Sequence, residues 1–225
     1  MKVVLLPLKD PAHAKQRLAG HLTPKERQEL AWAMLEDVTR AVRAAITPDQ
    51  VVVVTRGHPA LLAEQSSWQV IEENQQISES HSVDRACRLL QQRGASVVLR
   101  LPTDIPLLEP EDVDVLLNLE LGARSAVIIP SRDGKGTNAL LRTPPDAFPS
   151  RFGENSLALH QEEARRRRVE LKILENTRIS FDLDEYSDLL RFMQLENETR
   201  TAQVLRNFNS LKQHSLNPMS VHVRE

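Results

Sequence analysis

The chain has only one cysteine, Cys87, among its 225 residues. One cysteine cannot form an internal disulfide, and a zinc site built from cysteines is not expected. The sequence also lacks an apolar run near the roughly 18 residues that span a bilayer. The segment Met1–Pro7 lacks the longer apolar stretch and small-residue cleavage site of a signal peptide. We therefore expect it to form a first β-strand in a protein of the reducing cytoplasm, with no membrane partner.

A strong excess of charge is absent as well. The formal net charge is −2, so the whole protein is not expected to bind nucleic acid by electrostatic attraction. Hydrophobic residues make up 40% of the chain, which is enough for a core. A length of 225 residues favours a single α/β domain.

Short apolar runs alternate along the chain with segments of helical spacing. The expected strands cover residues 2–6, 51–55, 68–71, 96–101, 125–130, 138–142 and 170–174. The expected helices cover residues 23–45, 59–66, 83–93, 110–119, 155–168, 185–195 and 197–208. Such alternation predicts a three-layer α/β fold, with a mostly parallel sheet covered by helices on both faces. We predict one domain over residues 1–208, followed by a tail over 209–225 that is mobile unless it docks.

Ligands of such sheets bind beyond the carboxyl ends of the strands, so polar residues just after a strand are the first candidates. The first such segment is PLKDPAHAKQRL, which carries Lys9, Lys15 and Arg17. Three cations in one loop suit a triphosphate; the alternative is a solvated basic loop. The segment has neither a Walker A motif nor GxGxxG, so nothing supports a kinase or a dinucleotide-binding protein.

Asp104 follows directly after the apolar run that ends at Leu101 and is itself followed by proline and apolar residues. A carboxylate in such surroundings is costly unless it binds a cation or a helix N-terminus. Magnesium prefers one or two carboxylates together with phosphate oxygens and water. Capping of the helix that starts near Pro110 is the alternative, but Asp104 lies six residues too early for it.

Asp182 and Asp184 form a D-x-D pair just before a predicted helix. In an extended segment this spacing places both carboxylates on one face, which is unfavourable unless a cation lies between them. The alternative is that Asp184 caps the helix that starts at Glu185 while Asp182 is merely exposed. Short D-x-D matches are frequent by chance, so the pair gains weight only together with Asp104.

Five segments in this order resemble one enzyme family. They are PLKDPAHAKQRL, LPTDIPLL, DGKGTNALL from Asp133, RFGENSLALHQEEARRR from Arg151, and FDLDEYSDL. The family comprises the guanylyltransferases that activate 2-phospho-L-lactate, phosphoenolpyruvate or 3-phosphoglycerate on the way to the deazaflavin coenzyme F-420. It is a branch of the nucleotidyltransferases that include the molybdopterin guanylyltransferases. The resemblance covers about Met1 to Leu195 and implies a Rossmann-like, nucleotide-diphospho-sugar transferase-like fold.

The resemblance also implies roles for single residues. It implies Mg²⁺ ligands at Asp104, Asp182 and Asp184, contacts with GTP phosphates from Lys9, Lys15 and Arg17, and contacts with the acceptor from Thr137, Gly153 and Ser156. Of these, Lys9, Lys15 and Asp104 would act in catalysis. The residues themselves agree with a role in binding an anionic acceptor. Glycine permits a close backbone approach, and Ser156 lies near a helix start, whose free N–H groups favour an anion.

One stretch departs from the family. Many relatives have Gly-Leu-Asn-Ala-Ala where this chain has Ser82-Val83-Asp84-Arg85-Ala86. We expect Ser82 and Asp84 to contact the nucleotide. A carboxylate at position 84 could accept from guanine N1–H and its 2-amino group, although the change also leaves the base preference open.

The resemblance therefore implies an enzyme that transfers GMP from GTP to a small phosphorylated carboxylic acid and releases pyrophosphate. Its product would pass to the next enzyme of the coenzyme pathway. Two alternatives stay open: a cytidylyl- or molybdopterin-type transferase, and a nucleotide-binding domain without catalysis. The acceptor and the assembly are also open, with a homodimer as one possible assembly. The seven histidines show no paired metal spacing and are interpreted as surface or core residues.

Overall fold

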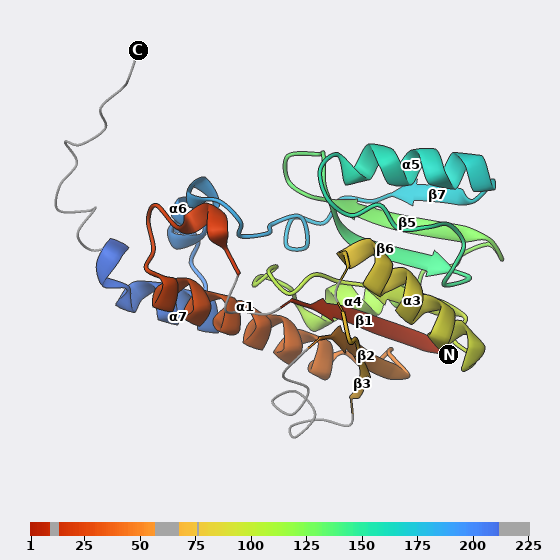
Figure 1. Ribbon diagram of the computed structural model, residues 1–225, viewed down its shortest axis with the longest axis horizontal. Helices are drawn as coiled ribbons and strands as arrows, with labels where there is room; N and C mark the ends of the chain where they lie inside the picture. The colour runs from red at the N-terminus through yellow and green to blue at the C-terminus, as the bar shows by residue number, and fades with distance from the viewer. Residues whose placement is uncertain (10–13, 57–67, 76, 212–225) are drawn as a thin grey trace, which may run out of the picture.

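The computed structural model describes residues 1–9, 14–56, 68–75 and 77–211 (Figure 1). Its strands are β1 (Lys2–Leu8), β2 (Gln50–Thr55), β3 (Gln69–Glu72), β4 (Val97–Arg100), β5 (Ser125–Pro130), β6 (Thr137–Thr143) and β7 (Glu170–Ile173). Its helices are the 3-10 helix η2 (Gln16–Leu18), α1 (Pro24–Ala44), α3 (Glu79–Gln92), α4 (Pro110–Leu117), α5 (Ser156–Arg167), α6 (Tyr186–Gln194) and α7 (Arg200–Asn207). Within these ranges no helix combines the length and apolar character needed to cross a membrane. The helix predicted over residues 59–66 lies outside the described residues.

The described strands form one mixed sheet in the order β3-β2-β1-β4-β6-β5-β7. The central strand β1 runs parallel to both neighbours, and its Leu5 lies opposite Val52 of β2 and Arg100 of β4. Two further pairs, β2 with β3 and β5 with β7, are also parallel. β6 alone in this sheet is antiparallel, to both β4 and β5. The predicted α/β fold with a mostly parallel sheet is confirmed.

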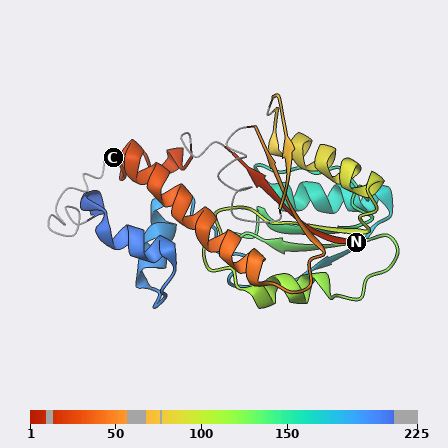
Figure 2. The same ribbon diagram turned by 90° about the horizontal axis from the view of Figure 1, so that it is seen from below.

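Helices cover both faces of the sheet, with α3 and α4 on opposite sides (Figure 2). Side chains of β1 alternate between the two faces. Val3 and Leu5 pack in a core with α3, whereas Val4 and Leu6 pack in a core closed by α1 and α4. This period of two makes β1 apolar throughout, as expected of a strand buried on both faces.

The β5–β6–β7 side of the sheet has its own covering helix. There α5 lies along β7 and β5 (Figure 1), and a core that includes Ile128, Leu140, Phe148 and Ala164 joins them. The segment 144–155 joins the end of β6 to α5, and the first turn of α5 lies next to the residues that precede β6. Leu157 N donates to Lys135 O at 2.9 Å and fixes this contact.

Beyond one end of the sheet, η2, the first half of α1, α6 and α7 pack together, and we call this unit the helical lobe (Figure 1). Its core includes Leu18, Leu30, Met34, Phe192 and Leu205, all of them buried. The lobe is therefore held by apolar packing of its own and not only by contacts with the sheet.

The chain stays packed slightly beyond the domain end predicted at residue 208. Ser210 Oγ donates to Glu26 Oε2 at 2.7 Å, and Leu211 is buried in the core of the helical lobe. Glu26 is also the third helical residue of the predicted capping box with Thr23 at the start of α1. Residues 212–225 of the predicted tail lie outside the described residues.

Two elements extend further than predicted. α3 begins at Glu79 rather than at residue 83, because the Ser78 hydroxyl caps it by accepting from His81 N at 3.2 Å. β1 continues through Pro7 to Leu8. β4 ends opposite Leu5, so Pro7 has no strand beside it on that side and its missing N–H costs the sheet little.

A buried carboxylate fastens α7 to α1. Asp37 of α1 accepts from the backbone N–H groups of Arg200 and Thr201, each at 2.8 Å. Those two N–H groups belong to the first turn of α7, where the helix itself supplies no acceptor. Asp37 is 1% exposed, so water cannot replace it.

We expect Asp37→Ala to lower the free energy of unfolding by about 2–4 kcal/mol, because two buried N–H groups lose their acceptor. Urea denaturation followed by circular dichroism measures this change. Glu36→Ala is the matched control, since Glu36 is an exposed neighbour whose ion pair with Arg200 is long, at 3.6 Å, and should cost less than about 1 kcal/mol. Equal losses in the two variants would contradict the role of Asp37.

Candidate active site

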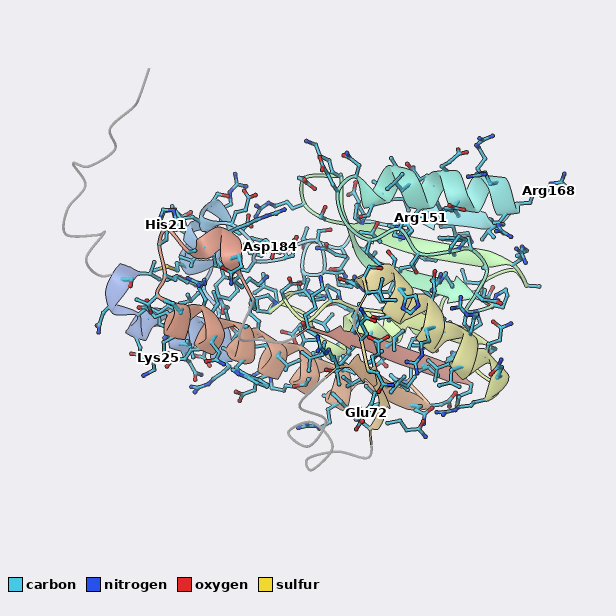
Figure 3. All side chains as sticks on the ribbon, viewed as in Figure 1. His21, Lys25, Glu72, Arg151, Arg168 and Asp184 are labelled. Carbon is cyan, nitrogen blue, oxygen red and sulfur yellow. The ribbon has the colours of Figure 1, made fainter. Side chains whose placement is uncertain are left out.

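A lysine ammonium joins two carboxylates at the C-terminal edge of the sheet. Lys15 Nζ lies 2.8 Å from Asp104 Oδ2 and 2.5 Å from Asp184 Oδ1. Asp104 follows β4, and Asp184 lies in the loop before α6, beside η2 (Figure 3). The Lys15 backbone has φ 54°, in the left-handed region that non-glycine residues seldom adopt. Its side chain is only 7% exposed, so this turn delivers a buried ammonium to the two carboxylates.

The charges of this group stabilise one another. Burial of Lys15 works to lower its pKa, but the Asp104 and Asp184 carboxylates outweigh burial and raise the pKa above its ordinary value. Burial of Asp104 works to raise its pKa, yet the Lys15 ammonium holds that pKa below its usual range, with smaller contributions from Arg100 and Lys9. Lys15 is therefore cationic and Asp104 anionic at neutral pH.

Asp182 shares this edge but has a different partner. Its Oδ1 accepts from Asn138 Nδ2 at 3.0 Å, and the same amide donates to Ile179 O at 2.8 Å. Burial raises the pKa of Asp182 to about 6, and the nearby charges of Asp104 and Asp184 add to the rise, against the effect of the Asn138 hydrogen bond. Asp182 is thus a partly buried carboxylate that a further cation would stabilise.

The three aspartates fit Mg²⁺ in the chemistry of their donors, since this ion prefers carboxylate oxygens. The loops that carry them are joined by a hydrogen bond from Leu183 N to Asp104 O at 3.1 Å. In the described part of the chain, however, no three acidic, histidine or cysteine side chains are arranged as a ready metal-binding group. The Lys15 ammonium lies between Asp104 and Asp184. The metal roles of the three aspartates therefore stay a prediction.

The other two predicted cations border the same group. Lys9 Nζ lies 3.0 Å from Glu79 Oε2, and Glu79 also forms an ion pair with Arg100. Arg17 Nη1 lies 3.9 Å from Asp184 Oδ2, and its side chain is 69% exposed. Lys9 and Arg17 thus have cationic groups near the edge where Lys15 is buried, although their contact with a nucleotide stays a prediction.

The three predicted acceptor residues gather around the first turn of α5. Ser156 is the first residue of the helix and Gly153 lies in the loop before it, with φ 124°. Thr137 begins β6, and its Oγ1 lies 3.0 Å from Nδ1 of His160, one turn into α5. The Ser156 side chain is buried, and its hydroxyl makes no hydrogen bond to the described residues. The structure therefore brings the three together, although no ligand contact is tested.

His160 is the main residue of this region that sequence analysis left among ordinary histidines. It is fully buried, and its Nε2 accepts from Arg151 N at 2.8 Å. Burial lowers the pKa of His160 to about 3, and the charges of Arg142, Arg100 and Arg151 lower it further. The ring is therefore neutral at physiological pH. His160 lies in a polar segment with helical spacing. Nothing in that pattern indicated its contacts with Thr137 and Arg151.

The residues predicted to contact the nucleotide base are engaged with other protein groups. Ser82 is fully buried, and its hydroxyl donates to Glu73 Oε2 at 2.6 Å. Asp84 accepts from Ser150 N at 3.0 Å, from Ser150 Oγ at 2.7 Å and from Arg142 Nη1 at 3.2 Å. Asp84 thus ties α3 to the loop after β6. A contact with guanine stays a prediction for both residues.

Adjacent residues of β6 connect the two parts of the site. The Thr137 side chain reaches His160 on α5, whereas the Asn138 side chain reaches Asp182 before α6. Arg100 of β4 donates to the carbonyl oxygens of both, at 3.3 Å and 3.0 Å. Asp184 and Arg151 lie well apart in Figure 3, so the site extends along this edge. It offers charges at one end and hydroxyl and backbone donors at the other.

Solved structures share this fold. A putative nucleotide-diphospho-sugar transferase from Desulfovibrio desulfuricans superposes with a TM-score of 0.75 at 21% identity, over 95% of this chain and 97% of that one. A nucleotidyl transferase from Methanothermobacter gives 0.60 at 18% identity, over 91% and 97%. The chain therefore has the same fold as these two proteins.

Sequence relatives define the family within this fold. The model of the family described as "Guanylyl transferase CofC like" matches residues 1–221, so the chain belongs to that family and is a nucleotidyltransferase. A phosphoenolpyruvate guanylyltransferase from Rubrobacter xylanophilus is 36% identical, over 83% of this chain and 91% of that protein. A 2-phospho-L-lactate guanylyltransferase from Methanothermobacter thermautotrophicus is 31% identical, over 82% and 81%. The family predicted from five short motifs is confirmed.

The buried neutral histidine gives a pH-dependent contribution to stability. The unfolded chain binds a proton at position 160 near pH 6.5, whereas the folded protein resists that proton down to a pKa of about 3. As pH falls below 6.5, the wild type should therefore lose stability relative to His160→Gln, by up to about 1.4 kcal/mol per pH unit. Urea denaturation of both proteins between pH 7.5 and 4.5 measures the difference. A difference that does not change with pH would contradict a buried neutral imidazole.

Proposed function

We propose that this enzyme transfers GMP from GTP to phosphoenolpyruvate and releases pyrophosphate. The observation that carries the proposal is the pairing of two unlike clusters on one sheet edge. Lys15, Asp104 and Asp184 supply charge, while the buried Ser156 hydroxyl and the first turn of α5 supply donors for a small anion. A phosphate-bearing acid and a nucleoside triphosphate need those two kinds of subsite side by side.

The choice of acceptor rests on the relatives. Proteins named phosphoenolpyruvate guanylyltransferase from Rubrobacter and Conexibacter are each 36% identical to this chain. Two proteins named 2-phospho-L-lactate guanylyltransferase, from Methanothermobacter and Methanobrevibacter, are 31% and 29% identical. The two acids carry the same phosphate and carboxylate on the same three-carbon skeleton and differ in whether the bond between C2 and C3 is double or single, so both fit the anion-binding groups at α5.

The chemistry requires little covalent participation by the protein. An oxygen of the acceptor phosphate attacks the α-phosphorus of GTP, a phosphoanhydride forms, and the bond to the β-phosphate breaks to release pyrophosphate. Catalysis is then mainly positioning and charge neutralisation. Lys9, Lys15 and Arg17 would stabilise the phosphates of GTP and the leaving pyrophosphate.

We propose Mg²⁺ as the metal, held by Asp104, Asp182 and Asp184. The ion would supply Lewis-acid neutralisation of phosphate charge at this edge. In the structure, Lys15 already shares two of the three carboxylates, so the lysine must give up part of its contact to phosphate or metal. Its raised pKa keeps it cationic for that role.

An assay of purified protein with a panel of nucleotides and acids tests the function. GTP with phosphoenolpyruvate should give a guanylylated acid by mass spectrometry, together with pyrophosphate. Phospho-L-lactate and 3-phosphoglycerate serve as rival acceptors, and CTP, ATP and UTP as rival donors. A preference for CTP would replace the proposal with a cytidylyltransferase, and no turnover with any pair would leave a nucleotide-binding protein.

We expect Asp104→Asn to retain the fold but to lower kcat at least about a hundredfold, a loss of roughly 2.7 kcal/mol in transition-state stabilisation. The fold should survive because the hydrogen bond from Leu183 uses the backbone oxygen of Asp104. Circular dichroism and turnover are measured together. Asp146→Asn, which changes an exposed carboxylate, is the control and should keep normal activity. Near-normal turnover of folded Asp104→Asn would remove Asp104 from the mechanism.

A further inference from the structure

We propose that His160 is a positioning residue that turns the Thr137 hydroxyl into an obligatory hydrogen-bond donor toward the anionic acceptor. The proposal rests on the proposed function for the identity of that acceptor. The proposal goes beyond that function by assigning a role to a buried residue that acts through Thr137.

The hydrogen bonds of His160 fix which ring nitrogen carries the proton. The backbone N–H of Arg151 can only donate, and it lies 2.8 Å from Nε2 of His160. Nε2 must therefore be the unprotonated acceptor nitrogen of the neutral ring. The single ring proton is then on Nδ1, which lies 3.0 Å from Thr137 Oγ1. His160 consequently donates to Thr137.

The Thr137 hydroxyl is left with a proton to donate. Its oxygen accepts from His160, so its own O–H points elsewhere, and no acceptor for it is found among the described residues. Thr137 follows Gly136 at the start of β6, beside the first turn of α5. The donor is therefore presented where the acceptor subsite is proposed. The donations therefore all run in one direction: Arg151 N–H donates to the ring, the ring donates to Thr137, and the Thr137 hydroxyl is free to donate onward.

The surroundings of His160 keep this direction from reversing. A protonated ring would donate from both nitrogens and lose the bond from Arg151. Burial opposes protonation, and the cations of Arg142 on β6, Arg100 on β4 and Arg151 in the loop before α5 oppose it too. Two aromatic rings limit the freedom of the imidazole, because Phe152 contacts it edge-on at 5.0 Å between centroids and Phe148 lies at 6.0 Å.

The alternative is that His160 only fills space in the core beside these aromatic rings. Glutamine and methionine variants of His160 distinguish the two explanations. Glutamine can accept from Arg151 and donate to Thr137, so it preserves the direction of the chain. Methionine fills similar space but donates nothing. Ala164→Gly on the same helix is the control for general destabilisation, because Ala164 is buried one turn further along and takes no part in the chain.

Steady-state kinetics with GTP and phosphoenolpyruvate test the proposal. His160→Met should raise KM for phosphoenolpyruvate about tenfold while KM for GTP changes less than about twofold. His160→Gln should stay within about threefold of the wild type. Thr137→Val removes the donor itself, so it should raise KM for phosphoenolpyruvate at least as much as His160→Met. The double variant should be no worse than Thr137→Val alone, because His160 acts only through the Thr137 hydroxyl. Ala164→Gly should leave both KM values unchanged.

Several results would overturn the proposal. One is an unchanged acceptor KM in folded His160→Met, another is an equal rise of both KM values, and a third is failure of glutamine to rescue. A second measurement does not depend on turnover: ¹⁵N NMR of the wild type should show a protonated Nδ1 and an unprotonated Nε2 at His160, and the opposite tautomer would also refute the proposal. If the wild type used no acid at all, the proposed function would fail while this tautomer test still decided the hydrogen-bond direction.

Discussion

Carboxylates that lie close together at a partly buried edge need a cation, and this constraint organises the edge of the sheet where the chemistry is expected. Lys15 satisfies it for Asp104 and Asp184 at 2.8 Å and 2.5 Å. Asp182 instead accepts from the neutral amide of Asn138, and burial raises its pKa to about 6. At an effective dielectric constant near 20, two unit charges 4 Å apart interact by about 4 kcal/mol. That magnitude explains why the left-handed turn that places Lys15 is tolerated: strain of this kind costs about 1–3 kcal/mol.

The antiparallel strand β6 joins the two halves of the site. Successive side chains of a strand point to opposite faces, so neighbouring residues can serve different subsites. Thr137 contacts His160 under α5, and Asn138 contacts Asp182 near the helical lobe. Arg100 holds both backbone carbonyls from β4. Two adjacent residues of one strand therefore connect the charged cluster to the groups proposed to bind the acceptor.

Local patterns predicted much of the fold and the charged cluster, but not the partners that are distant in sequence. The strands were recognisable as short apolar runs, and Asp104 stood out because it directly follows one of them. The antiparallel direction of β6 depends on the path of the chain between strands, which periodicity does not encode. The hydrogen bonds of Asp84 to Ser150 and Arg142 were not predicted, because those partners lie 66 and 58 positions away. His160 was missed for the same reason, since Thr137 lies 23 positions before it.

The charged cluster spans two separately packed hydrophobic cores. Lys15 and Asp184 are held by Leu18 and Leu183 in the core of the helical lobe, whereas Asp104 is followed by Ile105 in the core beneath the sheet. A phosphate group bound among these residues would therefore connect the helical lobe to the sheet. Its binding would raise the free energy needed to open the helical lobe away from the sheet, because a ligand stabilises the state that binds it. Phosphate recognition and the rigidity of the molecule would then be set by the same few contacts.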